Sequence, residues 1–218
     1  MLVGMWMTRE LVTVAPEDDV AEVALVMSRR HVRRVLVTRP GALGERLLGI
    51  ASARDLARAF PPDVNPFGAS LLGRRIGHPV AEVMSTHVET VTPETPIEDA
   101  ARRLRGRKIG ALPVVRGHSP VGIITESDIF QAFLEVIGAG DGSGSVRVTF
   151  DVSVAEDAVR VASDLARQHG LRITSALTMI HEGRHLAVVR VRGEGTEPFV
   201  DAIWRSGHRV VSVQQPHD

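Results

Sequence analysis

Cysteine is absent from this chain of 218 residues, which excludes disulfides, thiolate metal sites and a cysteine nucleophile. Its absence is compatible with a reducing cytoplasm. No stretch approaches the ~20 consecutive apolar residues that span a bilayer. Residues 1–10 show no basic start followed by a long apolar core, so the sequence predicts no signal peptide. We therefore expect a soluble, cytoplasmic protein that has no membrane partner.

A surplus of charge of one sign is also absent. The 26 Lys and Arg residues balance 26 Asp and Glu residues, so the formal net charge is zero. A non-specific nucleic-acid binder needs excess positive charge against phosphate, and the composition argues against such a partner. Lysine is nearly missing as well, because Lys108 is the only one. The cations are almost all arginines, whose planar, permanently charged groups suit phosphate.

One strand-to-helix stretch occurs twice. Residues 122–133 read as the end of a buried strand that leads directly into a helix, and residues 49–60 repeat the same residue classes in the same order. Each copy has a hydroxyl residue at the predicted helix start and an acid three positions later: Thr125 and Asp128 in one, Ser52 and Asp55 in the other. The first part of the chain is therefore an internal repeat.

Apolar residues at helical spacing mark an earlier helix in each copy, and the two helices are shifted by 77 positions. They are Val20, Val23, Ala24 and Met27 in the first copy, and Ile97, Ala100, Ala101 and Leu104 in the second. Strands are expected on either side, at 11–14 and 32–37 in the first copy and at 88–91 and 109–115 in the second. The strand-to-helix stretches are shifted by only 73, so the first copy holds four extra residues, which fall in a predicted Pro/Gly turn at 39–46. Each copy thus reads β-α-β-β-α, and two copies packed face to face would share a core.

The rest of the chain reads as a different domain. A linker at 61–79, with one short helical turn near 71–72, separates the copies, and a glycine- and serine-rich hinge at 138–145 follows the second. The remaining elements, in order, are a strand at 146–152, a helix that ends at Gly170, a hairpin around 182–184, a helix at 199–204 and a strand at 210–213. This βαββαβ order is the ferredoxin-like pattern.

The duplicated unit, over roughly residues 3–137, resembles the CBS domain, and the tandem pair resembles a Bateman module. The tail resembles an ACT domain, because residues 170–175 fit the start of its second strand, although residues 153–157 replace the family's Pro-Gly signature. The combination resembles bacterial acetoin-utilisation accessory proteins. The resemblance implies an α+β protein, divided into CBS repeats at 1–60 and 80–137 and an ACT-like domain at 146–218.

The resemblance also implies where an adenine nucleotide binds. In CBS modules, residues similar to Asp128 and Asp55 bind both ribose hydroxyls, since a carboxylate has two accepting oxygens. Residues at the helix start face phosphate, basic residues before the strand of the first copy reach it, and strand backbone meets the adenine edge. Asp128 marks the favoured site. The nucleotide-binding candidates are Asp128, Thr125, Ser127, Ile123, Asp55, Ser52, Arg54, Arg33, Arg34, Leu112, Pro113, Thr92 and Pro93.

Simpler interpretations stand beside these. A hydroxyl residue followed three positions later by an acid is also an ordinary helix cap. His181 and His185 have a metal-like spacing, but they flank a predicted turn and have no evident third ligand, so we expect no metal site. The chain has no nucleophile elbow, P-loop or dinucleotide-binding glycine motif, and we expect no catalysis.

The resulting hypothesis is a non-catalytic regulatory protein that binds AMP, ADP or ATP in the CBS pair, with NADH and S-adenosylmethionine as alternative ligands. No cofactor is required, a homodimer is expected, and the regulated protein is unknown. An alternative is an interaction scaffold with empty pockets that regulates an enzyme, a transporter or a transcription factor. An enzyme with a site between the pair and the tail ranks lower.

Overall fold

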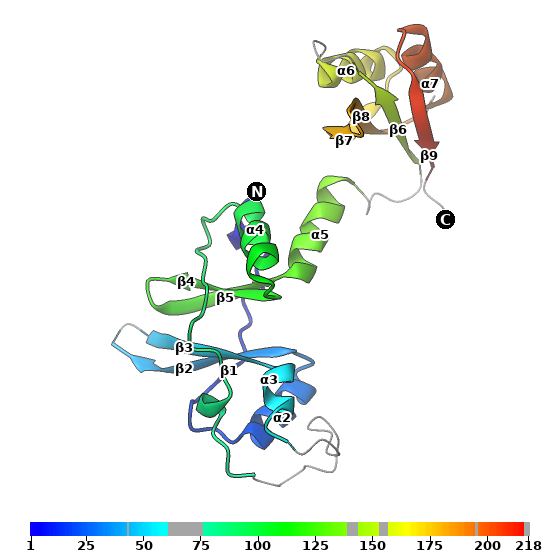
Figure 1. The fold of residues 1–218 in the computed structure, drawn as a ribbon. Coiled ribbons are helices and arrows are strands. Elements are labelled where there is room, and N and C mark those ends of the chain that lie inside the picture. Colours follow the sequence, from blue (N-terminus) through cyan, green and yellow to red (C-terminus); the bar gives the residue numbers. More distant parts are fainter. Residues whose placement is uncertain (43, 61–75, 139–143, 153–156, 195, 216–218) are drawn as a thin grey trace. The chain divides into compact units, whose positions relative to one another are not determined.

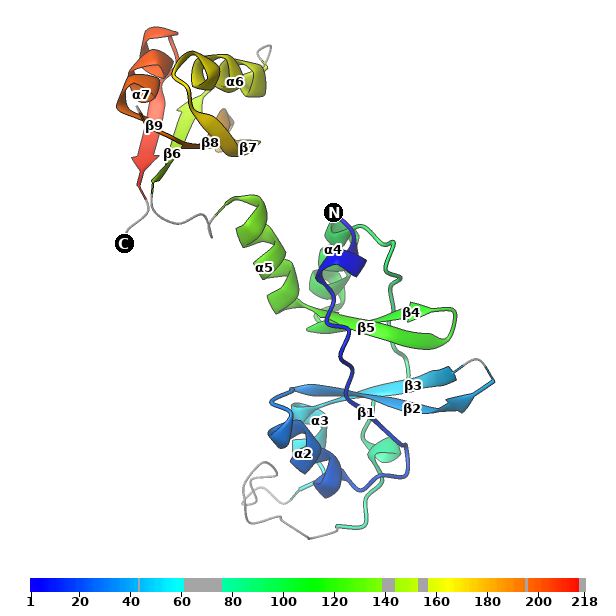
Figure 2. The same ribbon diagram turned by 180° about the vertical axis from the view of Figure 1, so that it is seen from behind.

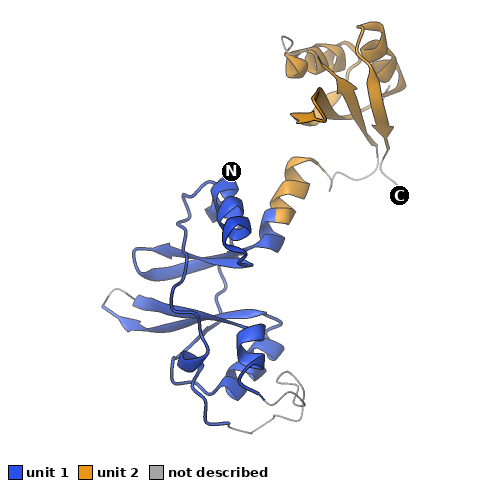
Figure 3. Cartoon of the chain, viewed as in Figure 1, with its two compact units in different colours: residues 1–129 blue, residues 130–218 orange. Residues whose placement is uncertain are grey.

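The computed structural model describes residues 1–42, 44–60, 76–138, 144–152, 157–194 and 196–215. The chain divides into two compact units, residues 1–129 and 130–218 (Figure 3). Within the described ranges, no helix combines the length and the apolar character needed to cross a lipid bilayer. The expected helical turn near residues 71–72 and most of the expected hinge at 138–145 lie outside the described residues.

The first repeat forms a three-stranded sheet in the order β1-β2-β3, with β1 parallel and β3 antiparallel to β2 (Figure 1). Its elements are α1 (Val3–Trp6), β1 (Thr13–Val14), α2 (Val20–Arg29), β2 (Arg34–Gly41), β3 (Gly44–Ser52) and α3 (Ala53–Ala57). The turn expected at residues 39–46 was wrong in extent, because β2 and β3 stay paired through Arg39↔Arg46 and Gly41↔Gly44. The four extra residues therefore lengthen a hairpin.

The second repeat pairs β4 with β5, antiparallel. Its elements are η2 (Val80–Glu82), α4 (Ile97–Arg107), β4 (Ala111–Arg116), β5 (Ser119–Thr125) and α5 (Glu126–Val136). The strand expected at 88–91 is reduced to one parallel bridge, Val91↔Val114. In the first repeat the Leu36 N–H donates to the Val12 carbonyl over 3.0 Å. The residue 77 positions after Leu36 is Pro113, which has no N–H, so the second repeat cannot form this bond.

The segments that lead into the two repeats exchange places. Thr8, from the start of the first repeat, bridges Ile123 on β5, while Ser85, from the start of the second, bridges Ile50 on β3. Each bridge has two backbone hydrogen bonds of 2.9–3.0 Å. Figures 1 and 2 show the two sheets stacked, with α2 and α3 outside one and α4 outside the other. The exchange ties both repeats into one unit of 1–129 with internal pseudo-symmetry.

The glycine that opens each strand-to-helix stretch is required by this exchange. A Cβ added at Gly49 would lie 2.5 Å from Met84 Sδ and 2.9 Å from the Ser85 carbonyl oxygen. A Cβ at Gly122 would lie 2.6 Å from Met7 Sδ, the equivalent atom of the other copy. A side chain at either position would therefore push the exchanged segment away from the sheet.

Replacing Gly49 with alanine is expected to destabilise residues 1–129 by about 1–3 kcal/mol, because the added methyl group overlaps Met84 and backbone that cannot move freely. Denaturant unfolding measures the change. Gly106→Ala is the matched control, since a Cβ there meets nothing within 4 Å and alanine favours the helix α4. Equal stability of Gly49→Ala and the parent protein would contradict the packing described.

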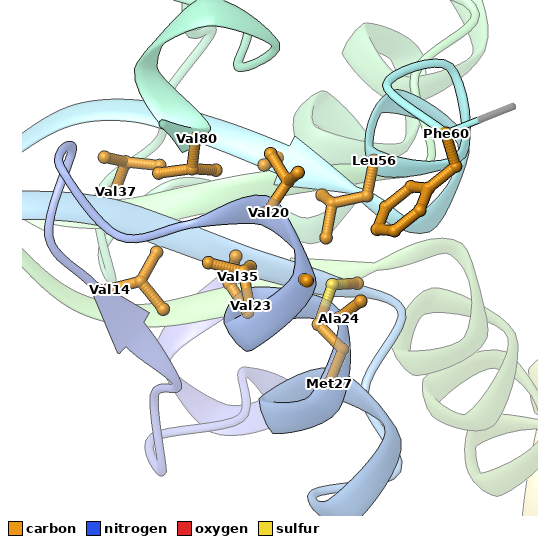
Figure 4. Close-up of a cluster of buried hydrophobic side chains, with 12 residues drawn as sticks. Val14, Val20, Val23, Ala24, Met27, Val35, Val37, Leu56, Phe60 and Val80 are labelled. Atoms are coloured by element: carbon orange, nitrogen blue, oxygen red, sulfur yellow. The ribbon is translucent and has the colours of Figure 1, made fainter. Parts of the chain in front are cut away.

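The core of the first repeat lies between α2, α3 and the inner face of its sheet (Figure 4). Met27, Leu56 and Val80 are all at most 1% exposed, and Val80 comes from the segment that leads into the second repeat. This packing fixes α3 against the sheet. It therefore holds Ser52 and Asp55 at a defined position at the end of β3.

Residues 130–218 contain a four-stranded antiparallel sheet in the order β7-β8-β6-β9. Its elements are β6 (Ser145–Asp151), α6 (Ala158–Gln168), β7 (Arg172–His181), β8 (Arg184–Arg192), α7 (Thr196–Arg205) and β9 (Val210–Gln214). The order βαββαβ is confirmed. The β7–β8 turn uses Glu182 and Gly183, both at positive φ, as a two-residue hairpin requires. Figure 2 shows this sheet from the other side, and its core packs α6 and α7 against β6 and β8.

Candidate functional site

The two predicted acids both cap their own helices. Asp55 Oδ2 accepts from the Ser52 backbone N–H at 2.9 Å and from the Ser52 hydroxyl at 2.6 Å. Asp128 Oδ2 accepts from the Thr125 N–H and hydroxyl, each at 2.8 Å. Oδ2 of each acid therefore serves as an ordinary helix cap, which was the simpler interpretation of the sequence. Only Oδ1 is left for a ligand, and one carboxylate oxygen can still accept two hydrogen bonds.

Two cavities in residues 1–129 are related by the internal repeat. Each is lined by the strand-to-helix stretch of one repeat together with the leading segment and strand start of the other. Eleven lining positions correspond pairwise, shifted by 77 or 73. The pairs include Ser85 with Thr8, Ser52 with Thr125, and Arg54 with Ser127. We call them the Asp55 cavity, of about 630 Å³, and the Thr125 cavity, of about 400 Å³.

The Asp55 cavity is rich in cations. Arg107 pairs with Glu89 at 3.4 Å, and Arg58 lies 3.8 Å from Asp55 Oδ1. The cavity's other cations are Arg34, Arg54 and Lys108. Among the described residues, none of these three has a carboxylate oxygen within 4.0 Å, the limit for an ion pair. They are therefore available to an anionic ligand.

The Thr125 cavity carries less positive charge. Arg33 and Arg34 line it together with the carboxylates of Glu10 and Glu126, and Ser127 stands where the other cavity has Arg54. Glu10 also lies 3.7 Å from Arg30 at the surface. Formal charges on the wall balance.

A third cavity, of about 600 Å³, lies between these two and shares walls with both. Its cations come from both repeats: Arg33, Arg34, Arg54, Arg105 and Lys108. Glu126 is the carboxylate on its described wall. The guanidinium of Arg34 crosses onto Gly110 of the other repeat, where a Cβ would collide with its Nη2. The missing side chain at Gly110 thus lets one arginine reach all three cavities.

The CBS domain family model matches residues 3–62 and 80–135, which together make up more than half of the chain. The chain belongs to the CBS domain family. Each match corresponds to one repeat, and the second extends through most of α5.

Similar proteins include CBS domain-containing protein YhcV of Bacillus subtilis, 30% identical over 56% of this chain and 79% of that protein. The inosine-5'-monophosphate dehydrogenase of Korarchaeum cryptofilum is 28% identical over 79% of this chain, but the match spans only 34% of the enzyme. Among solved structures, a protein from Vibrio cholerae described as an acetoin utilization protein (AcuB) has a TM-score of 0.52, with 29% identity over 65% of this chain and 96% of that one. CBSX2 in complex with AMP has a TM-score of 0.50, with 27% identity over 62% of this chain and 97% of that one.

Most of the predicted site residues lie on the walls of these CBS cavities. Arg33, Arg34, Ser52, Arg54, Asp55, Ile123, Thr125 and Ser127 do so. Asp128, the favoured acid, does not line any of the cavities described here, whereas its counterpart Asp55 does.

The structure places the other predicted residues elsewhere. Leu112 is fully buried, and Pro113 is buried beside it on β4. Pro93 packs on the N-terminus of the chain, where its carbonyl accepts from the Gly4 N–H at 2.8 Å. Thr92 precedes it and is exposed. The exchanged segment that includes residues 85–89 occupies the cavity wall instead.

Several residues of the cavity wall were not among the predicted site residues, and these include His87, Lys108 and Glu89. The available signal was the shift of 77, which relates Glu89 to Val12 and Pro113 to Leu36. Since Pro113 cannot donate the bond that Leu36 makes, the Glu89 carbonyl lacks that strand partner. No other hydrogen bond reaches this carbonyl from the described part of the chain, so a residue that lines the cavity carries a backbone acceptor without a protein donor there.

Proposed function

We propose that this CBS pair is a regulatory module that binds an adenine nucleotide, with the Asp55 cavity as the principal site. The observation that carries the proposal is the make-up of one cavity wall, which holds Asp55 with an oxygen not used by the helix cap, Glu89, and cations that have no carboxylate partner among the described residues. An adenosine phosphate needs all three kinds of partner.

The sugar and the base would meet acceptors. Asp55 Oδ1 can accept from the ribose hydroxyls, and Arg58, at 3.8 Å and on a side chain that is 74% exposed, can move aside. The Glu89 carbonyl suits the exocyclic amino group of adenine. Ile50, Val88 and Ile109 supply apolar surface for the ring.

The phosphate would meet arginine. Arg54 and Arg34 line the same cavity as Asp55, so they are the cations proposed to bind the phosphate of a ribose held by Asp55. Arginine binds phosphate oxygens through paired N–H donors. The central cavity, with Arg33, Arg105 and Lys108, offers room for further phosphates, so ADP and ATP are candidates as well as AMP.

Related CBS proteins support this ligand class. CBSX2, at 27% identity, is known as a complex with AMP. S-adenosylmethionine and NADH remain in the ligand panel because each contains an adenosine. The Thr125 cavity is the second proposed site, with Thr125, Ser127 and Ile123 on its wall and Asp128 behind Thr125.

We further infer that the tail is an ACT-like domain and that the protein is a homodimer. The element order and the strand order β7-β8-β6-β9 support the first inference. For the second, Phe130, Phe133 and Val136 are 47–60% exposed at spacing of three along α5, an apolar stripe suited to burial in an interface. Ligand binding would regulate an associated protein by favouring one arrangement of the module.

A ligand panel tests the proposal. Thermal unfolding of the full chain is measured with AMP, ADP, ATP, NADH and S-adenosylmethionine. A ligand present at 100 times its dissociation constant should stabilise the protein by about 2.7 kcal/mol. Guanosine monophosphate is the control, since its base presents an oxygen where adenine presents the amino group that would donate to the Glu89 carbonyl. A panel without any shift would reject nucleotide sensing and favour the scaffold alternative, for which the α5 stripe provides the surface.

A further inference from the structure

Equivalent positions on the walls of the two related cavities differ in charge. Arg54 on the wall of the Asp55 cavity corresponds to Ser127 on the wall of the Thr125 cavity. By the same shift, Lys108 corresponds to His31, and His87 corresponds to Glu10. Each of these replacements removes positive charge from the Thr125 cavity or adds negative charge to it.

Other differences between the two walls make the Thr125 cavity more positive, but they are too few to cancel the difference in charge. Arg33 stands in the Thr125 cavity where the Asp55 cavity has Gly110, and Val12 stands where the other has Glu89. In total, the Asp55 wall has five cations and two carboxylates, whereas the Thr125 wall has two cations and two carboxylates. Arg34 is common to both, because it lies over Gly110 between them.

We propose that the two cavities bind ligands of different charge. This hypothesis rests on the proposed function: the Asp55 cavity binds phosphorylated adenosines, and the Thr125 cavity binds uncharged or cationic adenosyl compounds. The residue pair Arg54 and Ser127 sets the difference. Both side chains are exposed in the first turn of their helices and line their cavities, so we expect each to meet the ligand's 5′ substituent.

The chemistry favours this division. A phosphate in the Asp55 cavity gains the guanidinium of Arg54 and the ammonium of Lys108, neither of which is engaged by a carboxylate within the described residues. A phosphate in the Thr125 cavity meets Arg33 and Arg34 but also the carboxylates of Glu10 and Glu126, so this wall offers it no net positive charge. A sulfonium or a neutral thioether at the 5′ carbon needs no such charge. Two sensors of one ligand family would then act in one module, with each reporting a different compound.

Reciprocal exchange of the two residues tests the proposal by calorimetry with AMP and 5′-methylthioadenosine. The parent protein should bind AMP in one cavity at least tenfold more tightly than in the other. Arg54→Ser should weaken AMP binding in the Asp55 cavity about tenfold and leave the affinity for 5′-methylthioadenosine unchanged. Ser127→Arg should strengthen AMP binding at the second site by a similar factor. Circular dichroism verifies that each variant is folded.

Two results would overturn the division of ligands. One is two AMP molecules bound with equal affinity to the parent protein, with no response to Ser127→Arg; nucleotide binding as proposed would then still stand. The other is equal weakening of both ligands by Arg54→Ser, which would make Arg54 a structural residue. If neither compound bound at all, the proposed function and the division would fall together. Raised salt gives an independent readout, since it should weaken AMP and spare the neutral thioether.

Discussion

Replacing Asp55 with asparagine is expected to weaken AMP binding about a hundredfold. In the proposed complex the carboxylate would accept from the ribose through Oδ1, and hydrogen bonds to a charged group contribute about 1.5–3 kcal/mol each. Asparagine keeps the oxygen that the Ser52 N–H needs, so the helix cap largely survives. It removes the charge and presents an amide group in place of one carboxylate oxygen. Calorimetry on the folded variant measures the change.

Two controls separate binding from capping. Ser52→Ala removes the hydroxyl contacts of the cap and should cost about 1 kcal/mol of stability, but it leaves the Asp55 carboxylate in the cavity. Asp128→Asn makes the same chemical change at the related cap, away from the Asp55 cavity. Unchanged AMP affinity in Asp55→Asn, or an equal loss in all three variants, would remove Asp55 from the site.

The repeat and its local structure could be predicted from sequence because they depend on short-range rules. A hydroxyl and an acid three residues apart cap a helix wherever they occur, and the structure has this cap in both copies. Apolar spacing placed α2 and α4, whose inward residues, such as Met27 and Leu104, are at most 2% exposed. The βαββαβ order of the tail followed from the same periodicities.

The exchange of leading segments could not be predicted in that way. Ile50 pairs with Ser85, and Ile123 with Thr8, across the two repeats. Pairing at that separation depends on the assembled sheets and leaves no periodicity in the sequence. The signature glycine Gly49 shows the constraint only after Met84 is seen to lie against it. For this reason Thr92 and Pro93 were expected on the cavity wall, where the exchanged segment lies instead.

The sequence also could not show how far a side chain extends into the other repeat. The sequence marked Arg34 as basic and close to a strand, but it did not show that the guanidinium crosses to Gly110 in the second repeat. It also gave no reason to prefer Asp55 over Asp128. The preference now proposed comes from neighbours that are distant in sequence, such as Lys108 and Glu89, which the fold brings to one wall.

The aromatic core of the tail is where a single substitution should affect stability most. Phe150 on β6 is fully buried, and it meets His208 edge-on, with ring centroids 5.7 Å apart. Phe150→Ala is expected to destabilise residues 130–218 by about 3–5 kcal/mol, because the lost apolar burial adds to the cost of the cavity left behind. Hydrogen exchange of the β6 and β8 amides in the full chain measures the loss within that unit.

The Phe150→Ala variant also tests whether nucleotide binding depends on residues 130–218. Every residue of the proposed Asp55 cavity lies in residues 1–129, which have their own core, so AMP should still protect β2 and β3 amides in Phe150→Ala. Val159→Ala is the control, since Val159 is 50% exposed on α6 and its replacement should change stability by no more than about 0.5 kcal/mol. If Phe150→Ala abolished protection by AMP, the binding site would depend on the tail. The CBS pair could then no longer be treated as a sensor complete in itself, and the tail would have to act on affinity as well as on output.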